Sequence, residues 1–202
     1  MVQSLLNHTF KLLVTPSAKL QNLLAERKWK EADQETARLM LKIANREEEG
    51  WLTVEDIDSF PCSDLYVIDR LWLKASNGHF GLSVQKQIYQ ELGGTRDYQV
   101  ELWRRFADEV GWRVNGYWRV YDKFTYDNLT FDLSAPKGHL PMGAATSETK
   151  LVGYKRVLYD RLENCQSVTQ LESVTFETND EIIESSSDNE TLPIPQSITD
   201  NQ

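Results

Sequence analysis

The sequence predicts an all-α fold followed by a disordered acidic tail, and two observations carry this prediction. Apolar residues recur at helical spacing through most of the first 110 positions, and strands do not alternate with helices as a parallel-sheet fold requires. Residues 163–202 hold nine acids, no Lys or Arg and one aromatic. So little apolar surface cannot offset the entropy of ordering, and we expect this segment to be disordered.

Charge and composition divide the chain of 202 residues into an N-terminal arm at 1–17, a helical domain at 18–162 and a tail at 163–202. The tail accounts for the whole net charge of −9, because residues 1–162 carry 22 basic and 22 acidic side chains. The net charge argues against general nucleic-acid binding. No apolar run approaches the ~18 residues of a membrane span. The arm resembles neither a signal peptide nor a transit peptide.

The first helices are predicted over about 20–29 and 30–48, where Leu and Ala recur at helical spacing and Gly50 can end the second one. Together they form a helical hairpin. Thr53 and Asp56 then make a capping-box pattern that opens a short helix.

Three more helices follow in order. The first covers 63–76 and stops at Asn77, and the next covers about 83–92. We expect Asp97 to cap a third helix that runs to Val110.

Residues 111–150 break the helical pattern. They carry seven aromatics, too many for an exposed loop, and residues 129–133 alternate with the period of a short strand. Cations surround these aromatics, which suits a large flat apolar ligand that bears carboxylates. Equally, the aromatics can pack on the helices as satellite core. The cations of this segment are Arg113, Arg119, Lys123, Lys137 and His139.

Catalytic motifs are absent from the sequence. The three histidines have no partner at metal-binding spacing, and no phosphate-binding glycine loop is present. We expect His79 and His139 to form hydrogen bonds rather than to act as axial ligands of a metallated ring. We expect Cys62 to have a structural role. Two cysteines, Cys62 and Cys165, give no disulfide framework and indicate a reducing compartment. The sequence therefore favours a binding protein over an enzyme.

Several collinear strings resemble one known family, the genomes-uncoupled (number four) family of tetrapyrrole-binding proteins of oxygenic phototrophs, over about residues 18–162. They are Glu31–Thr36 with Leu39–Leu41, Arg46–Leu52, Glu55–Ile57, Phe60–Leu65, Ile68–Trp72, Phe80–Gln85, Val110–Arg113 and Leu129–Pro141.

The resemblance implies a compact helical domain shaped like a cupped hand, with a long, partly irregular late loop. It implies binding of protoporphyrin IX or magnesium-protoporphyrin IX, with bilins as ligands of some members. It also implies a non-catalytic monomer that stimulates magnesium chelatase through the large porphyrin-binding subunit. The expected location is the cytoplasm of a cyanobacterium or the plastid stroma of an alga, at most peripheral to photosynthetic membranes. The alternative is a bilin-binding or protein-interaction signalling module that uses the same cleft.

The resemblance also implies two loops that close over the ligand, by position at about 50–62 and 111–145. We expect aromatic and apolar side chains to contact or support the ring, and three cations to meet its propionates. The cations are Arg113, Arg119 and Lys137. The remaining predicted ligand-binding residues are Trp112, Trp118, Tyr121, Phe124, Phe131, Leu133, Ala135, Pro136, His139 and Leu140, with Ile57 and Phe60 from the first loop.

Overall fold

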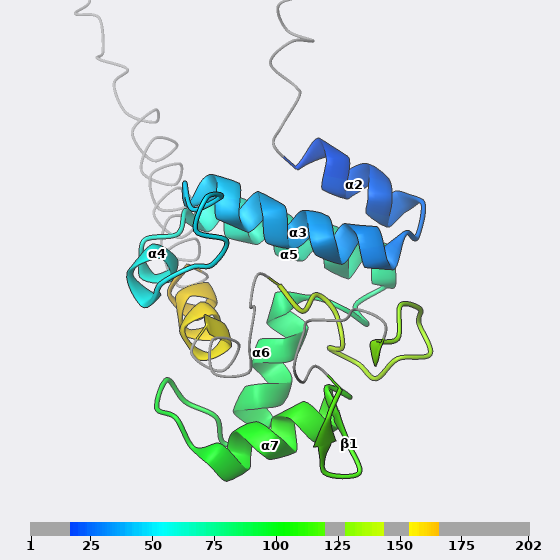
Figure 1. Cartoon of the computed structure of the whole chain (residues 1–202), viewed down its shortest axis with the longest axis vertical. Helices are drawn as coiled ribbons and strands as arrows, with labels where there is room; N and C mark the ends of the chain where they lie inside the picture. Colours follow the sequence, from blue (N-terminus) through cyan, green and yellow to red (C-terminus); the bar gives the residue numbers. More distant parts are fainter. Residues whose placement is uncertain (1–16, 120–127, 144–153, 166–202) are drawn as a thin grey trace, which may run out of the picture. The chain divides into compact units, whose positions relative to one another are not determined.

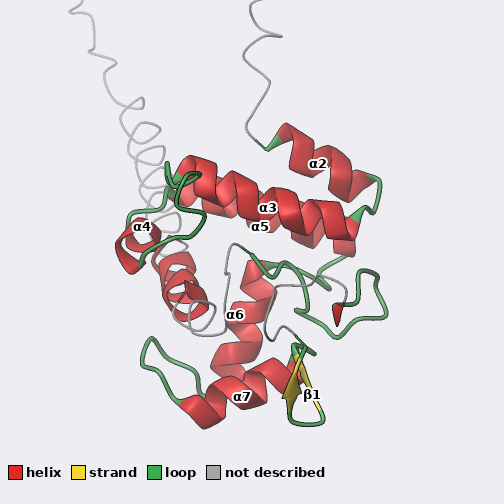
Figure 2. Cartoon of the chain, in the orientation of Figure 1, coloured by secondary structure: helices red, strands yellow, loops and turns green. Residues whose placement is uncertain are grey.

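The structure, a computed structural model, describes residues 17–119, 128–143 and 154–165. Helices dominate this part of the chain, as predicted (Figures 1 and 2). The all-α fold class is therefore confirmed. The elements are α2 (Ala18–Ala25), α3 (Trp29–Ile43), α4 (Val54–Asp58), α5 (Cys62–Ser76), α6 (Leu82–Glu91), α7 (Val100–Glu109), β1 (Arg113–Val114), β2 (Tyr117–Trp118) and a helix over 154–165.

The predicted arm and nearly all of the predicted tail lie outside the described residues. The helix over 154–165, drawn in yellow in Figure 1, continues three residues past the predicted domain end at 162. Its last residue, Cys165, is buried in the core. Among the described helices, none is long and apolar enough to cross a membrane.

A first hydrophobic cluster joins α2, α3, α5 and the helix over 154–165. Trp72 of α5 is fully buried, and its ring stacks on that of Trp29 from α3 at 6.0 Å between centroids. The Trp72 Nε1–H donates to Thr36 Oγ1 at 3.0 Å, so the indole is also satisfied as a polar group. These contacts place α3 and α5 side by side (Figure 1).

A second cluster is built from aromatic residues of α6 and α7 and of the segment that follows α7. Phe106 is its centre: the ring lies 5.4 Å from that of Tyr89 and 5.5 Å from that of Trp112, both edge to face. Trp112 is fully buried here. The predicted alternative of satellite core therefore holds for this residue.

Two helix ends differ from the prediction. The helix expected to reach 48 ends at Ile43, because Asn45 adopts a left-handed φ of 55° and turns the chain before Gly50. Asp97 does not cap the last predicted helix, since α7 starts at Val100 after Gln99. The Asp97 N–H instead donates to Thr95 Oγ1.

Other predicted boundaries are confirmed. The Thr53 hydroxyl accepts from the Asp56 N–H at 3.1 Å, and the Asp56 carboxylate accepts from the Thr53 N–H at 2.8 Å. This reciprocal pair is a capping box and starts α4. Asn77, with a φ of 53°, ends α5 as expected.

The expected strand at 129–133 is wrong. Residues 128–143 run as turns and irregular chain (Figure 2). The Asp132 carboxylate accepts from the Ser134 N–H at 2.7 Å, and this local turn bends the chain away from the extended form that a strand needs. Within the described residues, strands occur instead in the β1–β2 hairpin.

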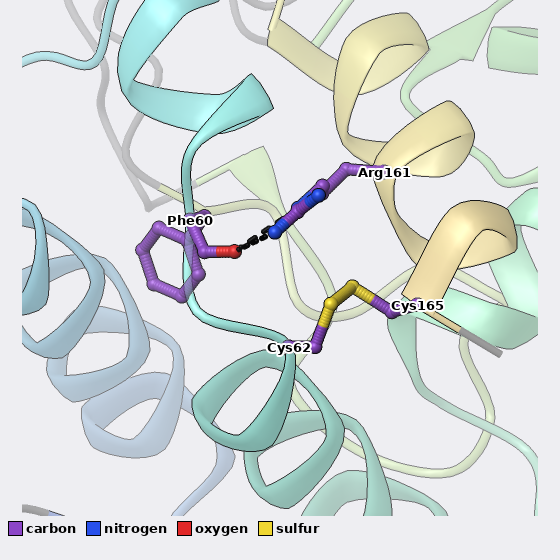
Figure 3. Close-up of a disulfide and its surroundings, with 4 residues drawn as sticks. All are labelled: Phe60, Cys62, Arg161 and Cys165. Atoms are coloured by element: carbon purple, nitrogen blue, oxygen red, sulfur yellow. Dashed lines mark hydrogen bonds between the residues drawn. A yellow bond between two sulfur atoms is a disulfide. The ribbon is translucent and has the colours of Figure 1, made fainter. Parts of the chain in front are cut away.

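The expectation of two reduced cysteines is also wrong for this structure. Cys62, at the start of α5, forms a disulfide with Cys165 at the end of the helix over 154–165 (Figure 3). The two positions are 103 residues apart, so the sequence spacing carries no signal of the pairing. Packing of the two helix ends brings their Cα atoms to 5.3 Å.

Candidate ligand-binding site

The segment over 128–143, which we call the late loop, is ordered by side chains that bind its backbone. Gln85 of α6 donates through Nε2 to the carbonyls of Gly138 and Pro141, at 2.9 and 2.8 Å. Lys155 adds a second donor to Pro141 O at 2.9 Å, and Asp33 accepts from the Met142 N–H at 2.6 Å. Buried backbone groups need partners, and here side chains of three helices supply them.

The position of Gln85 follows from the start of α6. The Asp69 carboxylate, on α5, accepts from the Ser83 N–H at 2.9 Å and so satisfies an otherwise open amide of the first turn. A side chain at Gly81 would place its Cβ 3.0 Å from Asp69 Oδ1, so only glycine allows this close approach.

His139 connects the late loop to the end of α7. Its Nδ1 lies 2.7 Å from Val110 O, and its Nε2 accepts from the Thr130 N–H at 3.2 Å. The proton must then sit on Nδ1, and the ring is neutral. Burial lowers the pKa of His139, with a smaller effect from Arg119. Both nitrogens are occupied, which agrees with the predicted hydrogen-bonding role.

The other histidine in the described part, His79, also binds the late loop. His79 Nε2 lies 2.8 Å from Ala135 O, and its own carbonyl accepts from the Gly138 N–H at 2.9 Å. Trp112 Nε1 donates to His139 O at 2.8 Å. The late loop is therefore fixed along its length, and Pro136 and Lys137 at its turn remain exposed.

Beneath the loop lies a buried polar cluster. Lys155 is fully buried and donates to Gln85 Oε1 at 2.8 Å, and Tyr159 donates to the same oxygen at 3.3 Å. Burial lowers the pKa of Lys155 to about 7, against a partly opposing effect of Asp33. Lys155 Nζ also lies 5.5 Å from the centroid of the Trp112 ring. The cluster therefore supports the loop from within the fold.

An open groove borders the β1–β2 hairpin and has a volume of 620 Å³. This volume is within the ~300–1,000 Å³ typical of small-molecule sites. The hairpin turns at Asn115 and Gly116, both with positive φ, as a two-residue type I′ turn requires. The groove is lined by Arg104, Arg113, Gly116, Tyr117 and Trp118.

Both arginines of the groove are held by neighbours. Arg113 donates through Nη1 to Asp108 at 2.8 Å and through Nε to Gly116 O at 3.2 Å, and neither bond uses Nη2. Arg104 is paired with Glu101 at 2.6 Å on the same helix. The guanidinium groups are thus oriented yet keep further donors, which suits recognition of carboxylates.

A bond from the end of the hairpin reaches the late loop. Arg119 Nη1 donates to Thr130 Oγ1 at 3.5 Å. At the following residue of the loop, Lys30 Nζ lies 6.0 Å from the centroid of the Phe131 ring. Phe131 is half-buried and Leu133 is exposed.

The predicted site residues separate into three groups by placement. Six are buried in the core and can only support a ligand in this conformation, while seven are half-buried or exposed on the hairpin or on the late loop. Tyr121 and Phe124 lie outside the described residues. The buried six are Ile57, Phe60, Trp112, Ala135, His139 and Leu140, and the other seven are Arg113, Trp118, Arg119, Phe131, Leu133, Pro136 and Lys137.

Sequence reasoning missed several residues of this region. Arg104 and Tyr117 line the groove, and the buried supports Asp33, Gln85 and Lys155 were not singled out. One available signal was Asn115-Gly116 between Val114 and the aromatic pair Tyr117-Trp118, a strong hairpin pattern. Asp33 and Gln85 lie within the family strings, but the helical pattern did not mark any of the three supports as buried, because a polar residue on a helix is expected at the surface until the fold is known.

A second groove of 550 Å³ runs along the outer face of α5. It contains none of the predicted site residues. Its lining includes the exposed Tyr66 and Val67 with the cations Arg70 and Lys74. Among the residues that the structure describes, no group of three or more His, Cys, Asp or Glu could hold a metal ion.

Comparison with known proteins gives consistent matches. A family model described as GUN4-like matches residues 15–155. Among curated relatives, a Ycf53-like protein of Synechocystis is 33% identical over 125 residues, covering 61% of this chain and 49% of the relative. A chloroplastic tetrapyrrole-binding protein of Arabidopsis thaliana is 31% identical over 137 residues, covering 66% and 50%. This chain thus spans about half the length of the curated relatives it matches.

Solved structures match at the level of the fold. The ligand-free structure of Arabidopsis thaliana GUN4 aligns with a TM-score of 0.59 at 27% identity, over 74% of this chain and 96% of that chain. GUN4 from Chlamydomonas reinhardtii aligns with a TM-score of 0.56 at 24% identity, over 74% and 88%, which supports the fold alone.

Proposed function

Because this chain belongs to the GUN4-like family, we propose that it is a non-catalytic tetrapyrrole-binding protein that regulates magnesium chelatase in chlorophyll biosynthesis. The ligand is protoporphyrin IX or magnesium-protoporphyrin IX, and the protein partner is the large porphyrin-binding chelatase subunit. The Arabidopsis relative is named as tetrapyrrole-binding. Relatives from Synechocystis and from a chloroplast support a cyanobacterial or plastid location.

The observation that carries this proposal is the pairing of aromatic side chains with oriented arginines in one groove. Tyr117 is 79% exposed and Trp118 is half-buried, so both can offer ring surface to a flat ligand. Arg113 has a donor atom left for a propionate. Ring stacking and a charge-assisted bond act together on a molecule that is apolar in its plane and acidic at one edge.

Apolar contact supplies enough energy for useful affinity. Removing ~400 Å² of apolar surface from water contributes ~10 kcal/mol before association costs, and micromolar binding needs about 8 kcal/mol. The arginines then fix which edge of the macrocycle faces α7. In this proposal the late loop serves as a rigid wall, because buried donors hold its backbone at Gly138 and Pro141, next to Lys137.

Fluorescence quenching by deuteroporphyrin tests the proposal. The native chain should show saturable quenching in the micromolar range, and Arg113→Ala should weaken binding about tenfold, or ~1.4 kcal/mol. Arg70→Ala in the α5 groove is the matched control and should bind normally. Equal loss in both variants, or no quenching at tens of micromolar ligand, would overturn the proposed site.

The ligand and the regulatory role need separate measurements. Competition between protoporphyrin, its magnesium form and a bilin ranks the three ligands, and we expect the porphyrins to bind more tightly. A reconstituted magnesium chelatase assay tests regulation, and we expect this chain to raise the rate at low porphyrin concentration. Tighter bilin binding with no effect on chelatase would favour the signalling alternative.

A further inference from the structure

One helix connects the Cys62–Cys165 disulfide to the late loop. The helix over 154–165 carries Cys165 at its end and Lys155 near its start. Lys155 donates to Gln85 and to Pro141 O of the loop. Ten residues of helix span ~15 Å, so a single rigid element joins the disulfide to the buried support of the loop.

Near its disulfide end, polar contacts tie the helix to the corner between α4 and α5. Arg161 donates through Nε and Nη2 to Phe60 O, at 3.0 and 2.8 Å (Figure 3). Arg96 bridges Asp160 of the helix and Asp58 of α4. These groups are half-buried or exposed, and such bonds contribute little each. The disulfide is the covalent member of this set.

We propose that the Cys62–Cys165 disulfide is a redox-dependent tether that keeps the late loop in its binding form by fixing the helix over 154–165. The proposal rests on the function proposed above, because it names the regulation of the same site. A helix of this length is marginal on its own and depends on tertiary contacts. The cross-link closes a separation of 103 residues and thus restricts the alternatives open to the chain when the helix detaches.

The two sulfurs differ in access. Cys62 is half-buried and occupies the first position of α5, whereas Cys165 is only 5% exposed. The thiolate of an external dithiol would therefore attack the Cys62 sulfur and form a mixed disulfide with it. Cys165 would leave as a thiolate and take up a proton. The second thiol of the reductant then displaces Cys62. The positive end of α5 favours the Cys62 thiolate as the leaving group.

The balance of this exchange is simple. One protein disulfide and one dithiol give two protein thiols and one reductant disulfide, with two electrons and two protons transferred to the protein. The co-reactant is a dithiol of low potential, either a small molecule or a protein. Detachment of the helix then removes Lys155 from Pro141 O and Gln85, and the loop loses one of its buried donors.

The test compares the oxidised and the reduced full chain. After treatment with dithiothreitol we expect the dissociation constant for deuteroporphyrin to rise about five- to tenfold, with the helical far-UV signal largely retained. Amide exchange at Gly138 and Met142 should quicken in the same sample. Cys62→Ser with Cys165→Ser should resemble the reduced chain and not respond to the reductant.

Lys155→Met identifies the route. This variant should bind deuteroporphyrin weakly when oxidised, and reduction should add little further loss if Lys155 carries the effect. If reduction weakened porphyrin binding by the same factor in Lys155→Met as in the native chain, Lys155 would not carry the effect. Free thiols detected by alkylation of the native chain before any reductant is added would overturn the tether. Unchanged amide hydrogen exchange at Gly138 and Met142 on reduction would do the same. If the oxidised chain binds no porphyrin, the proposed function fails, while the exchange measurement still decides this inference.

Discussion

The helical layer of α2, α3 and α5 and the late loop over 128–143 are both ordered, yet by different interactions. In the layer, apolar side chains pack around Trp72, which is fully buried between Trp29 and Phe80. In the loop, backbone carbonyls accept from side chains that other elements supply, above all Gln85 and Lys155.

This difference explains what each region can do. A packed layer is stable and insensitive to the detail of any one polar contact. A loop held by a few buried donors becomes less ordered when one of them is removed, since an unsatisfied buried carbonyl costs ~1–3 kcal/mol. The layer therefore supplies stability, and the loop is the part through which binding can be tuned.

The largest effect is expected from Trp72→Ala in the layer. It leaves a cavity and removes the bond to Thr36, so the free energy of unfolding should fall by ~3–5 kcal/mol. Urea denaturation followed by circular dichroism measures it. A loss below ~1 kcal/mol would show that the layer is not the main source of stability.

A smaller but more local effect is expected from Gln85→Leu. The carbonyl of Gly138 loses the Gln85 donor and that of Pro141 keeps Lys155, so the free energy of unfolding should fall by ~2 kcal/mol. Hydrogen exchange should quicken over 135–142 and porphyrin affinity should fall. Gln87→Leu, an exposed glutamine on the same helix, is the control and should change neither quantity.

The buried lysine makes stability depend on pH. With a pKa of about 7 in the fold and an ordinary value of 10.5, Lys155 is neutral in the folded chain over pH 7–9 while the unfolded chain still holds the proton. The unfolded state binds more protons there, so stability rises with pH in this window. Lys155→Met should flatten the slope, whereas the exposed Lys42→Met should keep it.

The smallest effect on stability is expected at the exposed edge of the late loop. Lys137→Ala removes a surface cation, so the free energy of unfolding should change by less than ~0.5 kcal/mol. Porphyrin affinity should fall about two- to threefold through the lost attraction to a propionate, less than in Arg113→Ala. Thermal unfolding measures the change in stability, and fluorescence titration measures the change in porphyrin affinity. A large drop in melting temperature would instead assign Lys137 a structural role.

The same division decides what the sequence could predict. Helical periodicity located α5 within a residue and the capping box of Thr53 with Asp56, because both are local patterns. Asp97 was a plausible cap, yet α7 starts three residues later, since the aromatic packing of Trp103 and Phe106 sets where the helix lies.

The candidate site was only half predictable. The aromatic and cationic composition of 111–145 pointed to Arg113 and Trp118, which line the groove. It could not separate them from Trp112, which is core, because burial depends on residues far away in the chain. Lys155 and the disulfide partner of Cys62 have no local sequence signal at all: each acts across 14 or more positions.

The β1–β2 hairpin has a consequence for protein engineering. Its two-residue turn at Asn115 and Gly116 is exposed and belongs to neither hydrophobic cluster, and Tyr117 beside it is largely exposed. A hairpin can be extended by matched pairs of residues without a change of register. New side chains could thus be added over the groove one pair at a time, to reshape ligand choice while both cores stay as they are.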